Sequence, residues 1–511
     1  MQIQFAYSQS MAEVQTRLDE YMNRLSFLGF SGALLVAKDG EVIFSKGYGM
    51  ADRARQIPVT TETVFTTGSI TKQFSAAAIL KLEMQGKLSV HDPITKYFKK
   101  VPQDKTSITL HHLLTHTAGF KPALGYDFAE INREEFVQLA LNSSLNHAPG
   151  EVYEYSNVGF SLLAAIVEQV SGQSYDAFLQ KYLFKPAGMS KTGYVAPNWK
   201  RDEMAHGYKG DKDWGTFLDH PRADDGPYWH LRGNGGILST VGDMYKWHLA
   251  LEGKKVLSEE AKRKLYTPYV REGKGADSFY GYGWSIVTTR RGTRLITHNG
   301  GNPYFSADFL RYVDEDVVIY MVANTAEQRA TRHSRQIARI VFGYDYILPS
   351  TVIETIPETE LQNTAMGQHA QAFLEMLSSR DEQHTRHLIE QHFAPELLNR
   401  ASMATHLRTL KSDQEEIGAV KYGQGVKAGE NAIELTVQSK RSGEWWLLTL
   451  EFEPRPPHRI VGIGVTDTEP PAETKTTTTK DEEQNNFAEK WGLPNSSTGR
   501  RAAAFLETIE R

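Results

Sequence analysis

In the first two thirds of the chain, short strand-like runs lie near both ends, and longer apolar runs typical of helices lie between them. Residues 31–49 predict a β-hairpin, because two apolar runs flank Asp39-Gly40, a pair that suits a tight turn. Clustered Ala, Ile and Leu predict a helix over residues 69–82. A second apolar helix is expected over residues 157–170, with Gly172 as its stop signal.

Three further strand-like runs, residues 292–297, 305–312 and 316–322, lie near the end of this region. Strands at both ends with helices between them predict an α+β domain whose antiparallel sheet is completed by the terminal segments. We expect this domain over residues 11–347, because a polar, proline-marked stretch follows it.

A second, smaller α+β domain is expected over residues 360–467, where a predicted helix precedes a meander of four strands. A proline- and threonine-rich linker over 468–490 and a terminal helix over 491–511 follow. Residues 372–375 and 504–507 both spell Ala-Phe-Leu-Glu. The tail is therefore either a truncated copy of the small domain or an unrelated helix of common composition, and both interpretations stay open.

Composition excludes several classes of protein. Of 511 residues, 40% are hydrophobic and 23% charged, as in ordinary globular proteins, and the net charge of -5 argues against nucleic acid as a partner. The absence of cysteine removes disulfides and thiolate chemistry. No apolar run reaches the roughly 20 residues of a membrane span, and the start lacks a signal sequence. We expect a soluble protein, periplasmic or secreted if a signal was removed and otherwise cytoplasmic.

Ser69-Ile70-Thr71-Lys72 is the first candidate for chemistry. A hydroxyl and an amine three residues apart at a helix start project from one face, and a lysine with a lowered pKa can take the serine proton. The pattern occurs once in the chain, on an apolar helix where an unpaired lysine is costly. The alternative is a surface lysine beside a capping serine.

Tyr155-Ser156-Asn157 opens the second apolar helix. A phenol can relay a proton to a leaving group, and a carboxamide can hold both a lysine and a substrate carbonyl. The alternative is a helix cap. His298-Asn299-Gly300-Gly301 follows a strand-like run, and its glycines would let a substrate backbone approach and supply an oxyanion hole, with a plain turn as the alternative.

Together, Ser69-x-x-Lys72, Tyr155-x-Asn157 and His298-x-Gly300 resemble the class C β-lactamase, DD-peptidase and esterase family of penicillin-recognising enzymes. Residues 113–119, 186–189 and 235–240 are similar to its connecting segments. The resemblance implies an antiparallel sheet sandwiched by helices, with a helical subdomain and the site between them. Ser69 would attack an acyl carbonyl, with general-base work shared by Lys72 and Tyr155.

The resemblance also implies that Asn157 positions substrate and that the amides of Ser69 and Gly301 form the oxyanion hole. Lys191-Thr192-Gly193 spells the third motif as β-lactamases have it, but no strand introduces it. The His298 segment is therefore preferred. A histidine there, largely neutral near pH 7, is similar to DD-peptidases, D-aminopeptidases and esterases.

We therefore expect hydrolysis of D-amino-acid peptides or small esters. The alternatives are a β-lactamase, or a penicillin-binding or sensing protein with slow turnover. No cofactor or metal is expected, although His111, His112 and His116 cluster, and a small-molecule or peptide substrate is the only partner implied. The second domain resembles the cone-shaped fold related to nuclear transport factor 2, with Trp445-Trp446 and Phe452 in its core.

Overall fold

A computed structural model describes residues 10–195, 197–273, 276–349, 355–399, 401–428 and 431–468. These residues form two compact units that divide between Tyr344 and Asp345, with Asn23–Leu28 grouped with the second. Residues 469–511 lie outside the described part of the chain, so the expected linker and the terminal helix with its possible repeat stay predictions.

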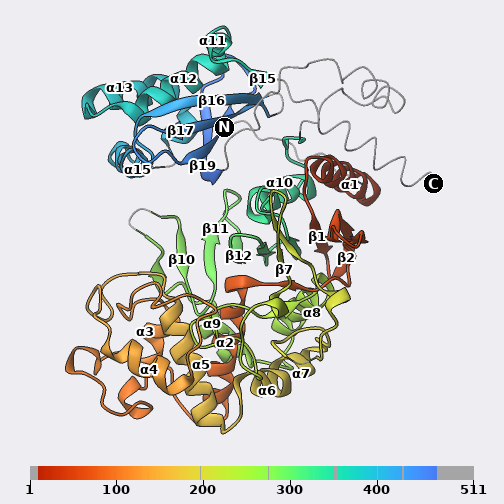
Figure 1. The fold of residues 1–511 in the computed structure, drawn as a ribbon, viewed down its shortest axis with the longest axis vertical. Helices are drawn as coiled ribbons and strands as arrows, with labels where there is room; N and C mark the ends of the chain where they lie inside the picture. The colour runs from red at the N-terminus through yellow and green to blue at the C-terminus, as the bar shows by residue number, and fades with distance from the viewer. Residues whose placement is uncertain are drawn as a thin grey trace. The chain divides into compact units, whose positions relative to one another are not determined.

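An antiparallel sheet forms the centre of the first unit (Figure 1), and its described strands run in the order β2-β1-β14-β13-β12-β11-β10-β9. β1 pairs with β14 along its whole length, from Gly32 opposite Ala323 to Lys38 opposite Val317. Both strands are almost wholly buried, as their continuous apolar sequences require. The strands are β1 (Gly32–Lys38), β2 (Glu41–Tyr48), β9 (Val270–Arg271), β10 (Ser278–Tyr280), β11 (Ser285–Thr288), β12 (Arg294–Gly301), β13 (Ser306–Tyr312) and β14 (Val317–Ala323).

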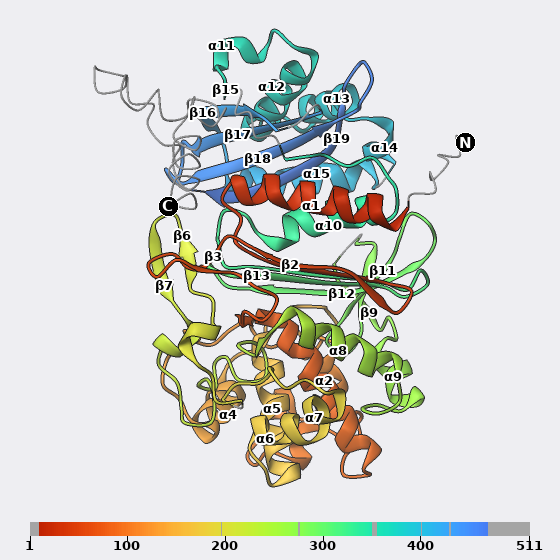
Figure 2. The ribbon, with the colours of Figure 1, turned by 90° about the vertical axis from the view of Figure 1, so that its right-hand side faces the viewer.

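Helices cover both faces of this sheet, with α10 on one face and α2 and α8 on the other (Figure 2). The predicted central helix is buried along nearly its whole length, and its Phe74 ring lies 5.0 Å from the rings of both Phe184 and Trp247. The helices are α1 (Met11–Phe27), α2 (Thr71–Met84), α3 (Leu110–Leu114), α4 (Arg133–Asn142), α5 (Asn157–Ser171), α6 (Tyr175–Leu179), α7 (Lys185–Ala187), α8 (Val241–Glu252), α9 (Glu259–Leu265) and α10 (Ala330–Val341).

Beside the large sheet, the described residues of the first unit form three short two-stranded ladders. In one of them Phe65 pairs with Ser239 and Thr66 with Leu238, which holds the segment before Ser69 against the glycine-rich loop at residues 233–236. The ladders are β3 (Met50–Asp52) with β4 (Ile57–Pro58), β5 (Phe65–Thr66) with β8 (Leu238–Ser239), and β6 (Gly207–Lys209) with β7 (Lys212–Gly215).

The second unit has its own antiparallel sheet, whose described strands run β15-β16-β17-β18-β19, and its own apolar core. Trp446 and Phe452 lie in that core, while Trp445 is half-buried. Its elements are β15 (Thr355–Ile356), α11 (Glu358–Leu361), α12 (Ala365–Ser378), α13 (Glu382–His392), α14 (Pro395–Leu398), α15 (Met403–Glu416), β16 (Val420–Lys427), β17 (Ala432–Ser439), β18 (Trp445–Phe452) and β19 (Ile460–Thr468).

The predicted fold class is confirmed: a large antiparallel sheet lies between helices, and a further sheet domain follows it. Within the described residues, no helix has both the length and the apolar character needed to cross a membrane.

Candidate active site

Ser69 lies on a 3₁₀ turn, Gly68–Ile70, that runs directly into α2, and Lys72 belongs to the first turn of α2. The predicted helix over 69–82 is thus a tight turn followed by an α-helix. Lys72 Nζ lies 3.2 Å from Ser69 Oγ, so the hydroxyl and the amine are direct neighbours.

Lys72 is fully buried, and its amine touches three oxygen atoms. Besides Ser69 Oγ, Nζ lies 2.7 Å from Oδ1 of Asn157 and 2.8 Å from the backbone carbonyl of Asn234. Burial lowers the pKa of Lys72 well below its usual range, opposed by the negative charge of Asp127. The two carbonyl oxygens can only accept hydrogen bonds. In the neutral form of Lys72, which burial favours, two N–H groups can donate to these oxygens while the lone pair faces the Ser69 hydroxyl.

Asn157 begins α5 and Ser156 occupies its N-cap position, but the serine makes no side-chain cap. Its hydroxyl instead donates to the backbone carbonyl of Lys121 over 2.7 Å. The alternative interpretation of Tyr155-Ser156-Asn157 as a simple helix cap is therefore wrong. The segment instead delivers the Asn157 amide to Lys72.

The Tyr155 ring packs over the amine, 4.7 Å from Lys72 Nζ to the ring centre. Burial raises the pKa of the Tyr155 phenol above its usual value, while a hydrogen bond with the Ser69 side chain acts in the opposite direction. Tyr155 is therefore a protonated phenol at neutral pH, in contact with both members of the Ser69 and Lys72 pair.

His298 lies within β12, buried, and not after it, because the strand continues to Gly301. The alternative of a plain turn is wrong for this segment. Its Nδ1 lies 2.5 Å from the carbonyl oxygen of Asn299, which can only accept, and its Nε2 lies 2.9 Å from the Tyr280 hydroxyl. The ring is thus neutral with the proton on Nδ1. Burial and the nearby Lys72 lower the pKa of His298 to about 3.

The His116 ring packs against two tyrosines of the site. Its centre lies 4.3 Å from that of Tyr155 and 4.7 Å from that of Tyr280. The backbone N–H of Ser156 donates to its Nδ1 over 3.0 Å, so the proton lies on Nε2, which has no described partner. Burial lowers the pKa of His116 well below its usual value. The ring supports Tyr155 as an uncharged surface.

The end of β12 approaches the backbone of Ser69 very closely. A methyl group at Gly300 would come within 2.2 Å of the Thr67 carbonyl oxygen and 2.6 Å of Ser69 N, and one at Gly68 within 2.1 Å of Gly301 N. Both positions therefore need glycine. β11 pairs with β12 only as far as Thr297, which leaves the β12 edge from His298 to Gly301 without a β11 partner among the described residues.

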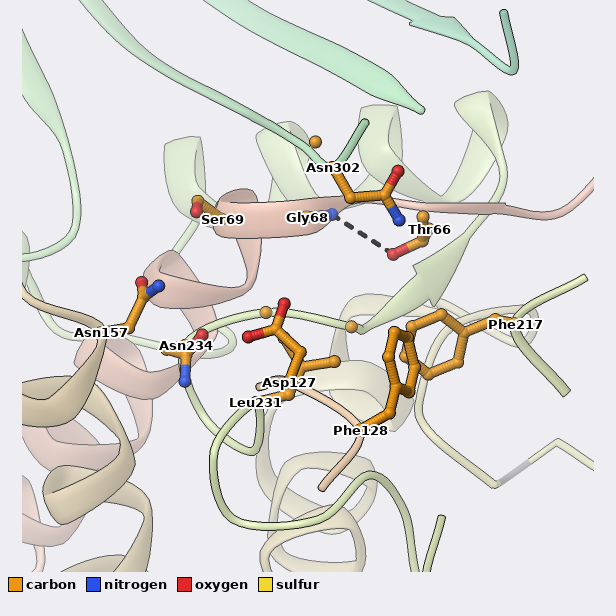
Figure 3. Close-up of a pocket in the computed structure, with 13 residues that line it drawn as sticks. Thr66, Gly68, Ser69, Asp127, Phe128, Asn157, Phe217, Leu231, Asn234 and Asn302 are labelled. Carbon is orange, nitrogen blue, oxygen red and sulfur yellow. Dashed lines mark hydrogen bonds between the residues drawn. The ribbon is translucent and has the colours of Figure 1, made fainter. Parts of the chain in front are cut away.

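A pocket opens in front of Ser69 (Figure 3), and its lining includes Asn157 and Gly301 from the predicted motifs. Several residues of this site were not predicted from the sequence, among them Asn234, Asp127, His116 and Tyr280. Asn234 and Asp127 are in the lining, and His116 and Tyr280 support Tyr155 and His298. Asn234 and His116 lie in or beside segments already noted for their family likeness, whereas Asp127 and Tyr280 carried no signal.

The Lys191-Thr192-Gly193 segment has structural partners instead. The Thr192 hydroxyl donates to Asp243 over 3.0 Å, and Lys191 Nζ lies 3.2 Å from a Glu62 carboxylate oxygen. Within the described residues, no three His, Asp or Glu side chains are grouped as metal ligands would be. His111 Nδ1 lies 2.8 Å from the Tyr282 hydroxyl.

Comparison with known proteins gives consistent matches. A family model described as Beta-lactamase matches residues 14–342. Penicillin-binding protein 4* of Bacillus subtilis (strain 168) is 29% identical over 340 residues, 63% of this chain and 74% of that protein. PbpX of the same strain is 34% identical over 280 residues, 55% of this chain and 68% of that protein. The crystal structure of a penicillin binding protein from Bacillus halodurans is 29% identical, with a TM-score of 0.53 over 60% of this chain and 97% of that chain.

Proposed function

The chain belongs to the beta-lactamase family, and from that premise we propose that it is a serine hydrolase that forms an acyl-enzyme on Ser69. The observation that carries the proposal is the position of the Lys72 amine. It is fully buried, 3.2 Å from Ser69 Oγ, with two carbonyl oxygens as its other hydrogen-bond partners. A hydroxyl beside a neutral amine is the arrangement that nucleophilic catalysis requires.

In the proposed reaction Ser69 Oγ attacks the substrate carbonyl carbon while its proton passes to Lys72 Nζ. The carbonyl oxygen becomes an oxyanion, held by the backbone N–H groups of Ser69 and Gly301. The tetrahedral intermediate then expels the leaving group, which takes a proton from the Tyr155 phenol, and Lys72 returns that proton to Tyr155. Water attacks the acyl-enzyme with the same groups acting in reverse, which releases the acid and restores Ser69.

Lys72 is the base in this proposal and Tyr155 the proton relay. Burial lowers the pKa of Lys72 and raises the pKa of Tyr155, so both shifts favour the neutral amine over a tyrosinate as the base. A tyrosinate base would need a stabilising cation, and burial disfavours the charged form of both neighbouring groups, Lys72 and His298.

For the substrate we propose D-amino-acid peptides or small esters. The neutral His298, already hydrogen-bonded through both ring nitrogens, offers no charge to the carboxylate of a β-lactam antibiotic. The open edge of β12 can pair with an extended substrate backbone, with Asn157 on the opposite side.

For the second unit we propose the cone-like fold related to nuclear transport factor 2, with the domain boundaries given above, on the basis of its helices followed by a meander.

The deciding experiment is active-site labelling with a fluorophosphonate and, separately, with labelled penicillin, each adduct being located by mass spectrometry. We expect the phosphonate on Ser69 in the wild type and in Ser45→Ala, a control at an exposed serine on β2, and no adduct in Ser69→Ala. Phosphonate on another residue, or none, would refute the proposal. A stable penicillin adduct on Ser69 would instead favour the slow-turnover alternative.

A further inference from the structure

One charged side chain, Asp127, lines the pocket in front of Ser69. The other lining residues are apolar side chains, glycines, hydroxyls and neutral amides. Figure 3 shows the carboxylate pointing into the pocket, between Asn234 on one side and the rings of Phe128 and Phe217 on the other. In the described part of the chain, Asp127 has no hydrogen bond or ion pair.

The loop that carries Asp127 is held by close packing. A methyl group at Gly125 would come within 2.6 Å of His230 Nε2, so the loop backbone lies directly against that imidazole. Next to Asp127, the Phe128 ring lies 5.6 Å from the Phe217 ring and 5.8 Å from the Trp214 ring. These contacts fix the position from which the carboxylate faces the pocket.

Within the described residues, no ion pair balances the charge of Asp127. Burial raises the pKa of its carboxyl group, while Lys72 and His230 act to lower it. Burial lowers the pKa of both Lys72 and His230, which disfavours the cationic form of each. A half-buried carboxylate with no partner is stabilised most by a cation that enters the pocket with the substrate.

We propose that Asp127 is a specificity-determining residue that binds the ammonium group of substrates with a free amine on the acyl side. The preferred substrates are then amides or esters of amino acids that have an unblocked amine and an apolar side chain. This inference rests on the proposed function of Ser69. The rings of Phe128 and Phe217, together with Leu231, form the apolar surface beside the carboxylate, so one pocket offers a partner to each group.

The test compares three p-nitroanilides with the same leaving group: phenylalanine p-nitroanilide, its N-acetyl derivative and the 3-phenylpropionyl analogue. The two chiral substrates are used as the same, more reactive enantiomer, and the third is achiral; all are assayed at a pH where the amine is protonated. We expect kcat/KM to favour the free amine by about tenfold to a hundredfold, ~1.4 to 2.8 kcal/mol at ~1.4 kcal/mol per tenfold. D127N should lower that ratio at least tenfold, and D127K should favour a succinyl anilide, which carries a carboxylate.

E130Q is the matched control, because Glu130 is an exposed acid on the same loop that does not line the pocket, and its ratio should equal that of the wild type. Fluorophosphonate labelling of every preparation separates the two proposals. A wild type without label on Ser69 refutes the hydrolase itself. A labelled wild type that hydrolyses no anilide, or lacks the amine preference, overturns this inference alone. The same holds if D127N keeps the wild-type ratio or if E130Q loses it.

Discussion

Replacing Lys72 tests the proposed base directly. Lys72→Met removes the nitrogen but keeps an apolar stem, and Lys72→Arg keeps a cation that cannot accept the serine proton. Because the Lys72 amine, the proposed base, lies 3.2 Å from Ser69 Oγ, both changes should slow acylation by about 10² to 10⁴, the range for a lost general base. That loss equals ~2.7 to 5.4 kcal/mol of activation free energy.

The assay is the time course of fluorophosphonate labelling at neutral pH, with the fold of each variant checked by thermal unfolding. Lys191→Met is the control, because Lys191 belongs to the Lys191-Thr192-Gly193 segment, pairs with Glu62 and does not line the pocket. Labelling of either Lys72 variant at the wild-type rate would refute the reasoning, and so would equal slowing in Lys191→Met.

The pH dependence gives a second check on Lys72. Because burial lowers its pKa well below 10.5, the labelling rate should stay level as the pH falls from 10.5 towards neutrality. An unperturbed lysine would lose about tenfold per pH unit over that range. The unfolded chain binds the lysine proton more tightly than the folded one, so this group destabilises the fold by ~1.4 kcal/mol for each pH unit below 10.5, down to its folded pKa. Lys72→Met should lack that slope in urea unfolding.

Three further outcomes are expected. Tyr155→Phe keeps the ring packing on His116 but lacks the phenol proton that protonates the leaving group. The kcat for p-nitroanilide hydrolysis should therefore fall about 10² to 10³. The kcat for p-nitrophenyl ester hydrolysis should fall much less, because nitrophenolate leaves without a proton. Gly300→Ala should abolish labelling and cost at least ~1 to 3 kcal/mol in unfolding, whereas Gly273→Ala, which meets nothing within 4 Å, should do neither. Burial raises the pKa of the Asp308 carboxyl group to about 6. The free energy of unfolding of the wild type in urea should therefore fall by ~3 kcal/mol as the pH rises from 3.8 to 6. Asp308→Asn should not show this fall.

Most of the sheet and both central helices follow from the sequence because their signals are local. The Asp39-Gly40 turn has φ angles of 53° and 76°, which such a pair adopts readily, and the apolar runs on either side become β1 and β2. The apolar run ending at Gly172 becomes α5, and Gly172 has the expected positive φ of 68°.

The rest of the site could not be found from local signals. Asn234 contributes a backbone carbonyl to Lys72 from 162 residues away, and any residue type would offer the same atom. Tyr280 is one of 23 tyrosines, and it matters only because the β-sheet places its hydroxyl 2.9 Å from His298 Nε2. Asp127 lies in a loop, where an acidic residue is ordinary, and it becomes notable because no described residue forms an ion pair or hydrogen bond with it.

The pairing of β1 with β14 also governs how the protein is made. As the chain leaves the ribosome, Ser69 and Lys72 emerge early, but the strand edge that must lie against Ser69 is almost 230 residues behind them. Until residues 317–323 have been synthesised, β1 lacks the partner that covers one of its edges. Such long-range pairing slows folding and leaves an apolar strand open to other nascent chains. The proposed hydrolytic activity should therefore arise late in biosynthesis, in one step with closure of the sheet.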